Sequence, residues 1–255
     1  MSLDIVIPAH NEEHRIDRML LAYRKGFPDA GVRFLAALDY CSDGTADIVR
    51  RHVTVDPRVE VHEYPKLGKG GVIMETVRRC TADFVAFVDA DCATPPSELQ
   101  RLVDASANAD GAIASRWHPA AVVPVLRPIR RRAASAGFAV AVRWLFHLPY
   151  RDTQCGAKVL RRDVASAVTP LLSSRDFLFD VDLLLVARGL GLRMVEVPTV
   201  WIDQPGSRLD VVRDAKRMAS SLLRLWIHHR VLPVRPSAAP GARVIDISGS
   251  ELVTS

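Results

Sequence analysis

Two aspartates one residue apart, Asp89 and Asp91, directly follow an apolar run at positions 84–88. The run is short and rich in phenylalanine and valine, which predicts a buried strand with the two carboxylates at its exit. Paired carboxylates in that position can bind a hard divalent cation, which prefers oxygen ligands and can hold a diphosphate against a protein. In isolation, Asp-x-Asp is more often a solvated turn in which Asp91 caps the next helix. Further polar clusters in this chain favour the metal site.

Those clusters recur at the ends of several predicted strands. Apolar runs predict strands at 3–8, 32–39, 59–64, 84–89 and 111–115, separated by helical patterns near 15–24, 43–52, 71–80 and 97–107. This alternation predicts an α/β fold with a mostly parallel central sheet and flanking helices. Such sheets bind ligands at the carboxyl ends of their strands. The polar clusters lie there, at positions 10–13, 39–43, 66–71 and 89–91.

Two of the clusters suit a nucleotide. The cluster at 10–13 can present polar groups to a base or ribose, although Asn11 and Glu12 can equally cap the following helix. The segment 66–71 opens a helix with three glycines and two lysines, which suits close backbone approach to phosphates at a positive helix end. It has the spacing of neither a P-loop nor a Gly-x-Gly-x-x-Gly dinucleotide site, so both of those common phosphate sites are excluded.

The composition is that of a globular protein. With 255 residues and 49% hydrophobic content, the chain can bury a large core in one extended domain or at most two. A net charge of +5 suggests an anionic partner, which can be a nucleotide, a lipid phosphate, an anionic membrane or nucleic acid. Four cysteines without a Cys-x-x-Cys pair indicate reduced thiols in a cytosolic protein. We expect neither a signal peptide nor a membrane-spanning helix, because residues 1–4 lead straight into a strand and no apolar run reaches about 20 residues.

Two basic amphipathic helices are predicted in the second half, near 130–147 and 209–230. The apolar stripe expected on the second comprises Val212, Ala215, Ala219, Leu222, Leu223 and Trp226. Arg127, Arg130, Arg131 and Arg132 precede or open the first. Such helices can lie in the plane of a membrane surface with arginines facing anionic head groups. The alternatives are a core helix with a solvated basic start and a C-terminal helix docked on the domain. We expect one domain over 1–230 and a disordered tail over 231–255, which is rich in proline and small polar residues.

The order of these motifs resembles family 2 glycosyltransferases of the GT-A fold. The first half carries it in residues 8–12, 39–45, 68–71 and 89–91. In the second half, segments 152–158, 179–184 and 206–209 look most like dolichyl-phosphate β-glucosyltransferases, with dolichyl-phosphate mannose synthases next. The resemblance implies an inverting, metal-dependent hexosyltransferase that moves a hexose, with glucose favoured, from a nucleotide-diphosphate sugar to a polyprenyl phosphate. The metal would be Mg²⁺ or Mn²⁺.

The resemblance also assigns donor-side residues. Asp89 and Asp91 match the metal and diphosphate motif, Glu12 and Asp39 match positions that contact the nucleoside, and Lys69 matches the segment near the donor. The donor site by this comparison comprises Pro8, Ala9, Asn11, Glu12, Asp39, Lys69, Asp89, Ala90, Asp91 and Arg208. The chain departs from the family at Leu38, where an acidic residue is usual, and at Ala93, where some mannose synthases have an amide ligand.

The acceptor side is predicted from arginines and carboxylates. A phosphate monoester is largely ionised near neutral pH because its second pKa is about 6, so it needs no strong general base. Arginines would hold it in line with the anomeric carbon. The candidates are Arg116, Arg130, Arg131 and Arg208. Asp152 would border the donor sugar or the acceptor. Asp182 would be the base if the acceptor were a hydroxyl, although Asp180 and Asp182 can instead cap the helix that begins near position 181.

The expected partners follow from this comparison. They are a nucleotide-sugar donor (UDP-glucose first, GDP-mannose next), a polyprenyl phosphate acceptor and an anionic membrane surface at the cytoplasmic face, with no nucleic acid. A membrane-protein partner stays open. One alternative is a family 2 transferase acting on a soluble hydroxyl acceptor in surface-polymer or specialised metabolism. Another is a non-catalytic scaffold that binds nucleotide sugars, against which the intact Asp89, Asp91 and Lys69 count.

Overall fold

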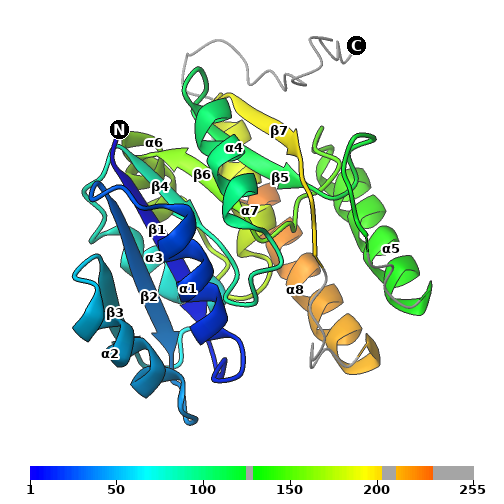
Figure 1. Cartoon of the computed structure of the whole chain (residues 1–255). Helices are drawn as coiled ribbons and strands as arrows, with labels where there is room; N and C mark the ends of the chain where they lie inside the picture. Colours follow the sequence, from blue (N-terminus) through cyan, green and yellow to red (C-terminus); the bar gives the residue numbers. More distant parts are fainter. Residues whose placement is uncertain (125–128, 203–210, 232–255) are drawn as a thin grey trace.

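The protein is built around one mixed sheet (Figure 1). The computed structural model describes residues 1–124, 129–202 and 211–231, but not the side chains of 129–134 and 211–217. In this part of the chain the sheet order is β3-β2-β1-β4-β6-β5-β7. The strands are β1 (Leu3–Ala9), β2 (Val32–Asp39), β3 (Val59–Tyr64), β4 (Phe84–Phe87), β5 (Gly111–Ser115), β6 (Lys158–Arg161) and β7 (Met194–Pro198). β6 runs antiparallel to both of its neighbours, and the other pairings are parallel.

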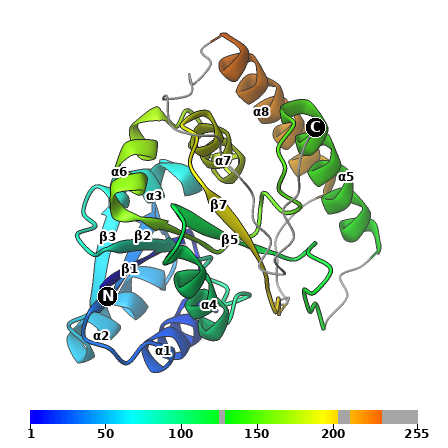
Figure 2. The same ribbon diagram turned by 90° about the horizontal axis from the view of Figure 1, so that it is seen from above.

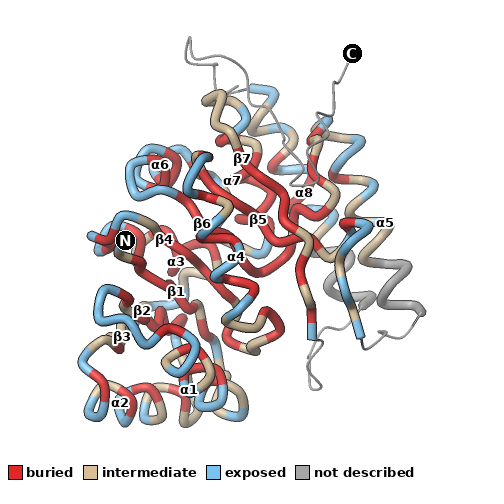
Figure 3. Tube along the Cα trace, turned by 45° about the horizontal axis from the view of Figure 1, so that its top comes forward, coloured by how far each residue is buried: buried red, intermediate tan, exposed pale blue. Residues whose placement is uncertain are grey.

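Helices cover both faces of the sheet. They are α1 (Ile16–Gly26), α2 (Thr45–Val55), α3 (Lys69–Val77), α4 (Pro96–Ser106), α5 (Ile129–Phe146), α6 (Arg162–Val168), α7 (Phe179–Gly189) and α8 (Val211–Val231), with a 3₁₀ turn at Thr169–Leu171. Alternate residues of the strands point to opposite faces. One hydrophobic cluster joins the sheet to α1, α2 and α4, and a second joins it to α3, α6 and α7 (Figure 2). Because both faces are covered, the strands other than β3 are buried along most of their length, whereas β3 at the end of the sheet is mostly half-buried (Figure 3).

The predicted α/β sheet is confirmed, and three strands, 32–39, 59–64 and 111–115, have the expected bounds. β4 is shorter than expected and ends at Phe87, so Asp89 lies in the turn beyond it. The strands β6 and β7 were not predicted. Because β6 runs antiparallel to β4, the segment before it, 152–157, arrives at the carboxyl end of β4. That placement brings the second half of the chain to the Asp pair.

Helices α5 and α8 contact each other beside the main body (Figure 1). Leu222 and Leu225 of α8 are buried, whereas Leu223, which the sequence placed on the same apolar stripe as Leu222, is exposed. On α5, Val142 is buried but Trp144 is exposed. In the described part of the chain, no helix combines the length and apolar character that crossing a membrane requires.

Candidate active site

The Asp pair lies at the carboxyl edge of the sheet, where the connection leaves β4. Asp89 Oδ1 is 2.9 Å from Lys69 Nζ, and Asp91 Oδ1 accepts a hydrogen bond from Ala93 N at 2.9 Å. Helix α4 begins only at Pro96, so Asp91 does not cap it. Burial and the neighbouring Asp89 raise the pKa of Asp91 above its ordinary value. Repulsion from Asp89 therefore adds to the cost of burying Asp91 in its charged form.

Glu12 adds a third carboxylate within electrostatic reach. It forms a bidentate ion pair with Arg15 at 2.6 and 2.8 Å. The pKa of Glu12 is raised above its ordinary value: burial is the largest cause, Arg15 opposes it, and Asp91 and Asp89 raise it further. The N-cap residue of α1 is Arg15, without a side-chain cap bond, so Glu12 does not cap this helix.

The other predicted nucleoside contacts shape the loops around the same edge. Asn11 has a positive φ of 56° and its Oδ1 accepts a hydrogen bond from Ser42 N at 2.8 Å, so it ties two loops together and does not cap a helix. Asp39 accepts hydrogen bonds from Leu67 N at 2.6 Å and Gly68 N at 3.1 Å. The end of β2 is thereby joined to the glycine-rich turn. Pro8 and Ala9 are the last two residues of β1, and Ala90 is buried between the two aspartates.

The glycine-rich turn packs against the loop before α7. Gly68 has a φ of +80°, and a Cβ there would lie 2.5 Å from Arg175 O. A Cβ on Gly70 would lie 2.6 Å from Phe179 Cβ. These glycines are therefore required for close backbone packing, whatever the turn also does for phosphates. Lys69, between them, sends its amine to the Asp89 side.

A buried lysine that the sequence analysis gave no role completes the cluster. Lys158 Nζ is 2.5 Å from Asp180 Oδ1, and Asp180 Oδ2 is 3.2 Å from Lys69 Nζ. Burial would lower the pKa of Lys69, but Asp180 and Asp89 outweigh it and hold the pKa above its ordinary value. Burial would raise the pKa of Asp180, but Lys158 and Lys69 hold it low. Asp180 thus binds two ammonium groups and does not cap α7, whose N-cap is Leu178. The available signal was a lysine directly before two apolar residues, Val159 and Leu160, in a short strand.

Arg116 and Asp152 form a buried bidentate pair next to this cluster. Arg116 donates from Nε at 2.7 Å and from Nη2 at 2.9 Å, and its guanidinium lies 4.9 Å from the Trp201 ring centre. Burial would raise the pKa of Asp152, but Arg116 holds it below its ordinary value, so the carboxylate stays ionised. Ser135 and the buried Thr153 line a small cavity beside this pair. Neither residue was predicted as a site residue, although Thr153 lies in the segment 152–158 that carries the family resemblance.

The hydrogen-bond partners of Asp182 differ from those of Asp180. Its carboxylate accepts hydrogen bonds from Ser173 N, Ser173 Oγ and Ser174 N at 2.7, 3.0 and 2.7 Å, and it contacts His229 Nε2 at 2.7 Å. Residues two apart on a helix point in different directions, so the structure directs Asp180 to Lys69 and Lys158, and Asp182 to His229 of α8. These contacts fit a structural role for Asp182. Its role as a base stays a prediction.

Several predicted residues cannot be placed. Arg127, Arg208 and the segment 206–209 lie outside the described residues, as does the tail 232–255. Arg130, Arg131 and Arg132 belong to α5, but their side chains are not described. Their contacts with a phosphate stay predictions.

The donor set at this edge fits a divalent metal. Asp89 and Asp91 supply carboxylate oxygens, and burial together with the neighbouring Asp89 raises the pKa of Asp91. Within the described residues no group of three or more acidic, histidine or cysteine side chains converges on one point. A metal held by two carboxylates would complete its shell with water and diphosphate oxygens, as Mg²⁺ commonly does.

Comparison with known proteins agrees with the fold and the motifs. The model of the family described as "Glycosyl transferase family 2" matches residues 4–168. Glycosyltransferase AglD of Haloferax volcanii is 30% identical over 92% of the chain, which spans only 38% of that protein. Dolichyl-phosphate beta-glucosyltransferase of Drosophila melanogaster is 30% identical over 91% of the chain and 76% of its own length. The crystal structure of glucosyl-3-phosphoglycerate synthase from Mycobacterium tuberculosis with UDP superimposes with a TM-score of 0.66, at 17% identity, over 95% of this chain and 83% of that one. The fold is GT-A.

Proposed function

The chain belongs to glycosyl transferase family 2, and we propose that it transfers a hexose, with inversion, from a nucleotide-diphosphate sugar to a polyprenyl phosphate. One observation carries the proposal: Asp89, Asp91 and Lys69 meet at the carboxyl edge of the sheet, within reach of the Arg116–Asp152 pair. The fold places ligands at this edge. The relative from Drosophila, named for transfer to dolichyl phosphate, supports the lipid acceptor.

The chemistry requires charge neutralisation at the leaving group. A bound Mg²⁺ or Mn²⁺, held by Asp89 and Asp91, would stabilise the departing diphosphate electrostatically. Lys69 would supply a second positive charge, since the ion pairs with Asp89 and Asp180 keep its amine protonated. Arg116, fixed by Asp152, would orient the acceptor phosphate for in-line attack. The acceptor enters already ionised, so no side chain has to remove its proton.

UDP-glucose is the proposed donor, with GDP-mannose as the second choice. The similarity to a named β-glucosyltransferase supports glucose, and segment 152–158 at the Asp89 side belongs to the same resemblance. We also propose that Glu12 and the loop at Asp39 contact the nucleoside of the donor.

The acceptor would be reached at an anionic membrane surface on its cytoplasmic face. Exposed apolar side chains on the two adjacent helices support this contact: Val140 and Trp144 on α5, and Leu223, Ile227 and Val231 on α8. Arginines at the start of α5 would add about 1 kcal/mol each before salt screening. Replacing Arg130 and Arg131 by glutamine should weaken binding to anionic liposomes and raise the KM for polyprenyl phosphate, with donor affinity unchanged.

A transfer assay tests the proposal as a whole. UDP-glucose and GDP-mannose are each paired with polyprenyl phosphate and with a soluble hydroxyl acceptor, with and without Mg²⁺ or Mn²⁺. Metal-dependent transfer from UDP-glucose to the lipid is the expected result. Preferential glycosylation of the hydroxyl compound would reject the lipid acceptor, and donor binding without any transfer would indicate a scaffold.

A further inference from the structure

Four charged side chains of alternating sign form a continuous chain beneath the candidate donor site. It runs from Lys158 through Asp180 and Lys69 to Asp89, with distances of 2.5, 3.2 and 2.9 Å between the charged atoms. The four residues come from β6, α7, α3 and the turn after β4. Exposure increases along the chain, from 0% for the Lys158 side chain to 34% for that of Asp89. The buried end therefore supports the end that a ligand can reach.

Lys158 neutralises Asp180 without taking all of its hydrogen-bonding capacity. Its amine contacts Asp180 Oδ1 and donates to Cys155 O at 2.8 Å. A buried carboxylate is costly unless it is paired and hydrogen-bonded. Because Lys158 occupies Oδ1, the other oxygen, Oδ2, is directed to Lys69.

Lys69 needs such a support to act at a defined position. A lysine is a point charge on a flexible four-carbon stem, and holding it in one place costs side-chain entropy. Asp180 Oδ2 and Asp89 Oδ1 hold the amine from two sides. Asp89 would also serve the metal, which leaves Asp180 as the contact dedicated to Lys69.

We propose that Asp180 is a positioning residue, which together with its counter-ion Lys158 holds the Lys69 ammonium where the donor diphosphate binds. The proposal rests on the proposed function of this edge as a nucleotide-diphosphate site. The alternative is a purely structural role, in which the same ion pairs only hold α3, α7 and β6 together.

A double substitution separates the two roles. Asp180→Asn leaves Lys158 buried without its anion, so it should lower both the Tm and the affinity for a nucleoside diphosphate. Replacing a whole buried ion pair by apolar residues of similar volume is often neutral or stabilising. Asp180→Leu combined with Lys158→Met should therefore recover the Tm but not the affinity.

The measurements are calorimetric titration with UDP and with GDP in Mn²⁺, and thermal unfolding of the same samples. We expect Asp180→Asn and the double variant to bind the better of the two ligands about tenfold more weakly, the loss typical of one charge-assisted hydrogen bond. If the double variant regains wild-type affinity together with wild-type Tm, Asp180 is only structural and the inference is wrong.

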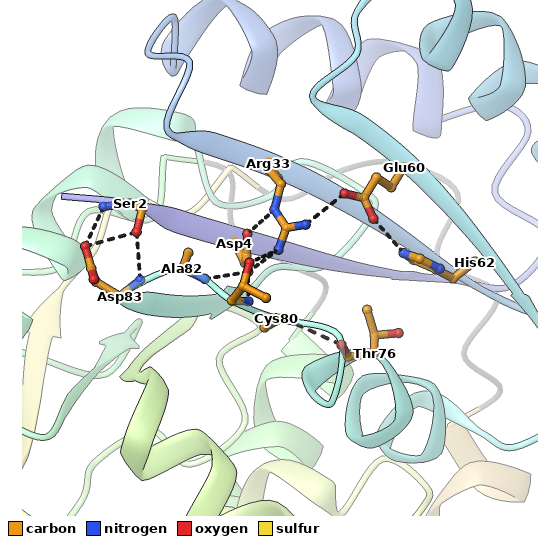
Figure 4. Close-up of polar contacts among 10 residues, drawn as sticks. Ser2, Asp4, Arg33, Glu60, His62, Thr76, Cys80, Ala82 and Asp83 are labelled. Carbon is orange, nitrogen blue, oxygen red and sulfur yellow. Dashed lines mark hydrogen bonds and ion pairs between the residues drawn. The ribbon is translucent and has the colours of Figure 1, made fainter.

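Asp4→Asn is the matched control. Asp4 is also fully buried and paired with a cation, Arg33, at 2.7 Å, but it lies in the first half of β1 (Figure 4). It should lower the Tm and leave the affinity unchanged. A loss of affinity in Asp4→Asn would show that destabilisation alone weakens binding, which overturns the inference.

Lys69→Met distinguishes failure of this inference from failure of the proposed function. If Lys69→Met binds UDP and GDP as the wild type does, or the wild type binds neither, the donor site itself is wrongly assigned and both proposals fall. If Lys69→Met weakens binding while Asp180→Asn does not, only the role of Asp180 is rejected.

Discussion

The amino and carboxyl edges of the sheet, where the parallel strands begin and end, carry similar residues in different electrostatic states. At the amino edge, Asp4 accepts hydrogen bonds from Arg33 Nε and Nη2 at 2.8 and 2.7 Å, and from Thr81 N and Ala82 N at 2.7 and 3.1 Å (Figure 4). Arg33 also donates to Glu60, which in turn contacts His62. Every oxygen of Asp4 is thus satisfied by the protein itself.

At the carboxyl edge the carboxylates outnumber the cations that reach them. Burial raises the pKa of both Asp91 and Glu12. Asp89 adds to the effect on both residues, and Asp91 adds to the effect on Glu12. Glu12 is paired with Arg15 and Asp89 with Lys69, but repulsion among the three carboxylates persists, in contrast to the Asp4 network. A satisfied network stabilises the fold, whereas an unsatisfied one is available to a cationic ligand.

The largest effect should come from removing the unsatisfied carboxylates. We expect Asp89→Ala and Asp91→Ala to lower transferase turnover at least about a hundredfold, the scale of losing one transition-state electrostatic contact, with the fold intact. Both residues lie beyond the end of β4 and outside the sheet. Turnover is measured under a chelator-controlled metal titration, and circular dichroism checks the fold. Wild-type turnover in either variant would show that the site is wrongly assigned.

Removing a carboxylate at the amino edge should lower stability and leave turnover unchanged. Asp4→Ala leaves Arg33 and two backbone N–H groups without their acceptor, so we expect a loss of about 3 kcal/mol in the free energy of unfolding. Urea denaturation measures this loss. Turnover of the protein that remains folded should not change. If turnover fell with Asp4 as it does with Asp91, the contrast between the two edges would not hold.

A smaller effect should follow from crowding Asp89. A Cβ on Gly156 would lie 1.9 Å from Asp89 Oδ2, so Gly156→Ala must displace that carboxylate. We expect metal affinity to fall about tenfold, equivalent to 1.4 kcal/mol. Calorimetry with Mn²⁺ measures the affinity. Gly137→Ala is the control, because a Cβ at Gly137 meets no atom within 4 Å. Equal affinity in the two variants would mean that Asp89 does not bind the metal.

The smallest expected effect is a pH-dependent change in stability caused by Asp91. The pKa of Asp91 is higher in the folded protein than its ordinary value of 3.8, so folding disfavours its charged form. Its contribution to stability is therefore unfavourable at neutral pH and disappears as the pH falls below the raised pKa. We expect Asp91→Asn, in metal-chelated buffer, to stabilise the protein at neutral pH and progressively less toward pH 3.8. Urea denaturation across this range measures the difference, and destabilisation at neutral pH would contradict the prediction.

The sequence predicted the fold best where local pattern and burial coincide. The strands at 32–39 and 111–115 were correct because apolar runs buried on both faces are easy to recognise. The strand at 59–64 is only partly buried, and its apolar residues alternate with polar ones, which is also a strand pattern. Strand β6 was missed because it is only four residues long and carries a lysine and an arginine. The prediction of the buried face of α8 was wrong at Leu223, which is exposed. The face that a helix buries depends on what packs against it.

The cluster of Asp89, Asp91 and Lys69 followed from the sequence, because turns after parallel strands must converge at one edge of the sheet. The sequence did not predict which further carboxylate contacts Lys69. Asp180 and Asp182 are equivalent in a local pattern, and both open the first turn of α7. Only the tertiary structure directs Asp180 to Lys69 and Asp182 to His229, and only the antiparallel β6 sets the buried Lys158 against Asp180. The physical reason is that residue types and spacing determine which groups reach an edge, whereas long-range packing of helix and strand determines which charges pair there.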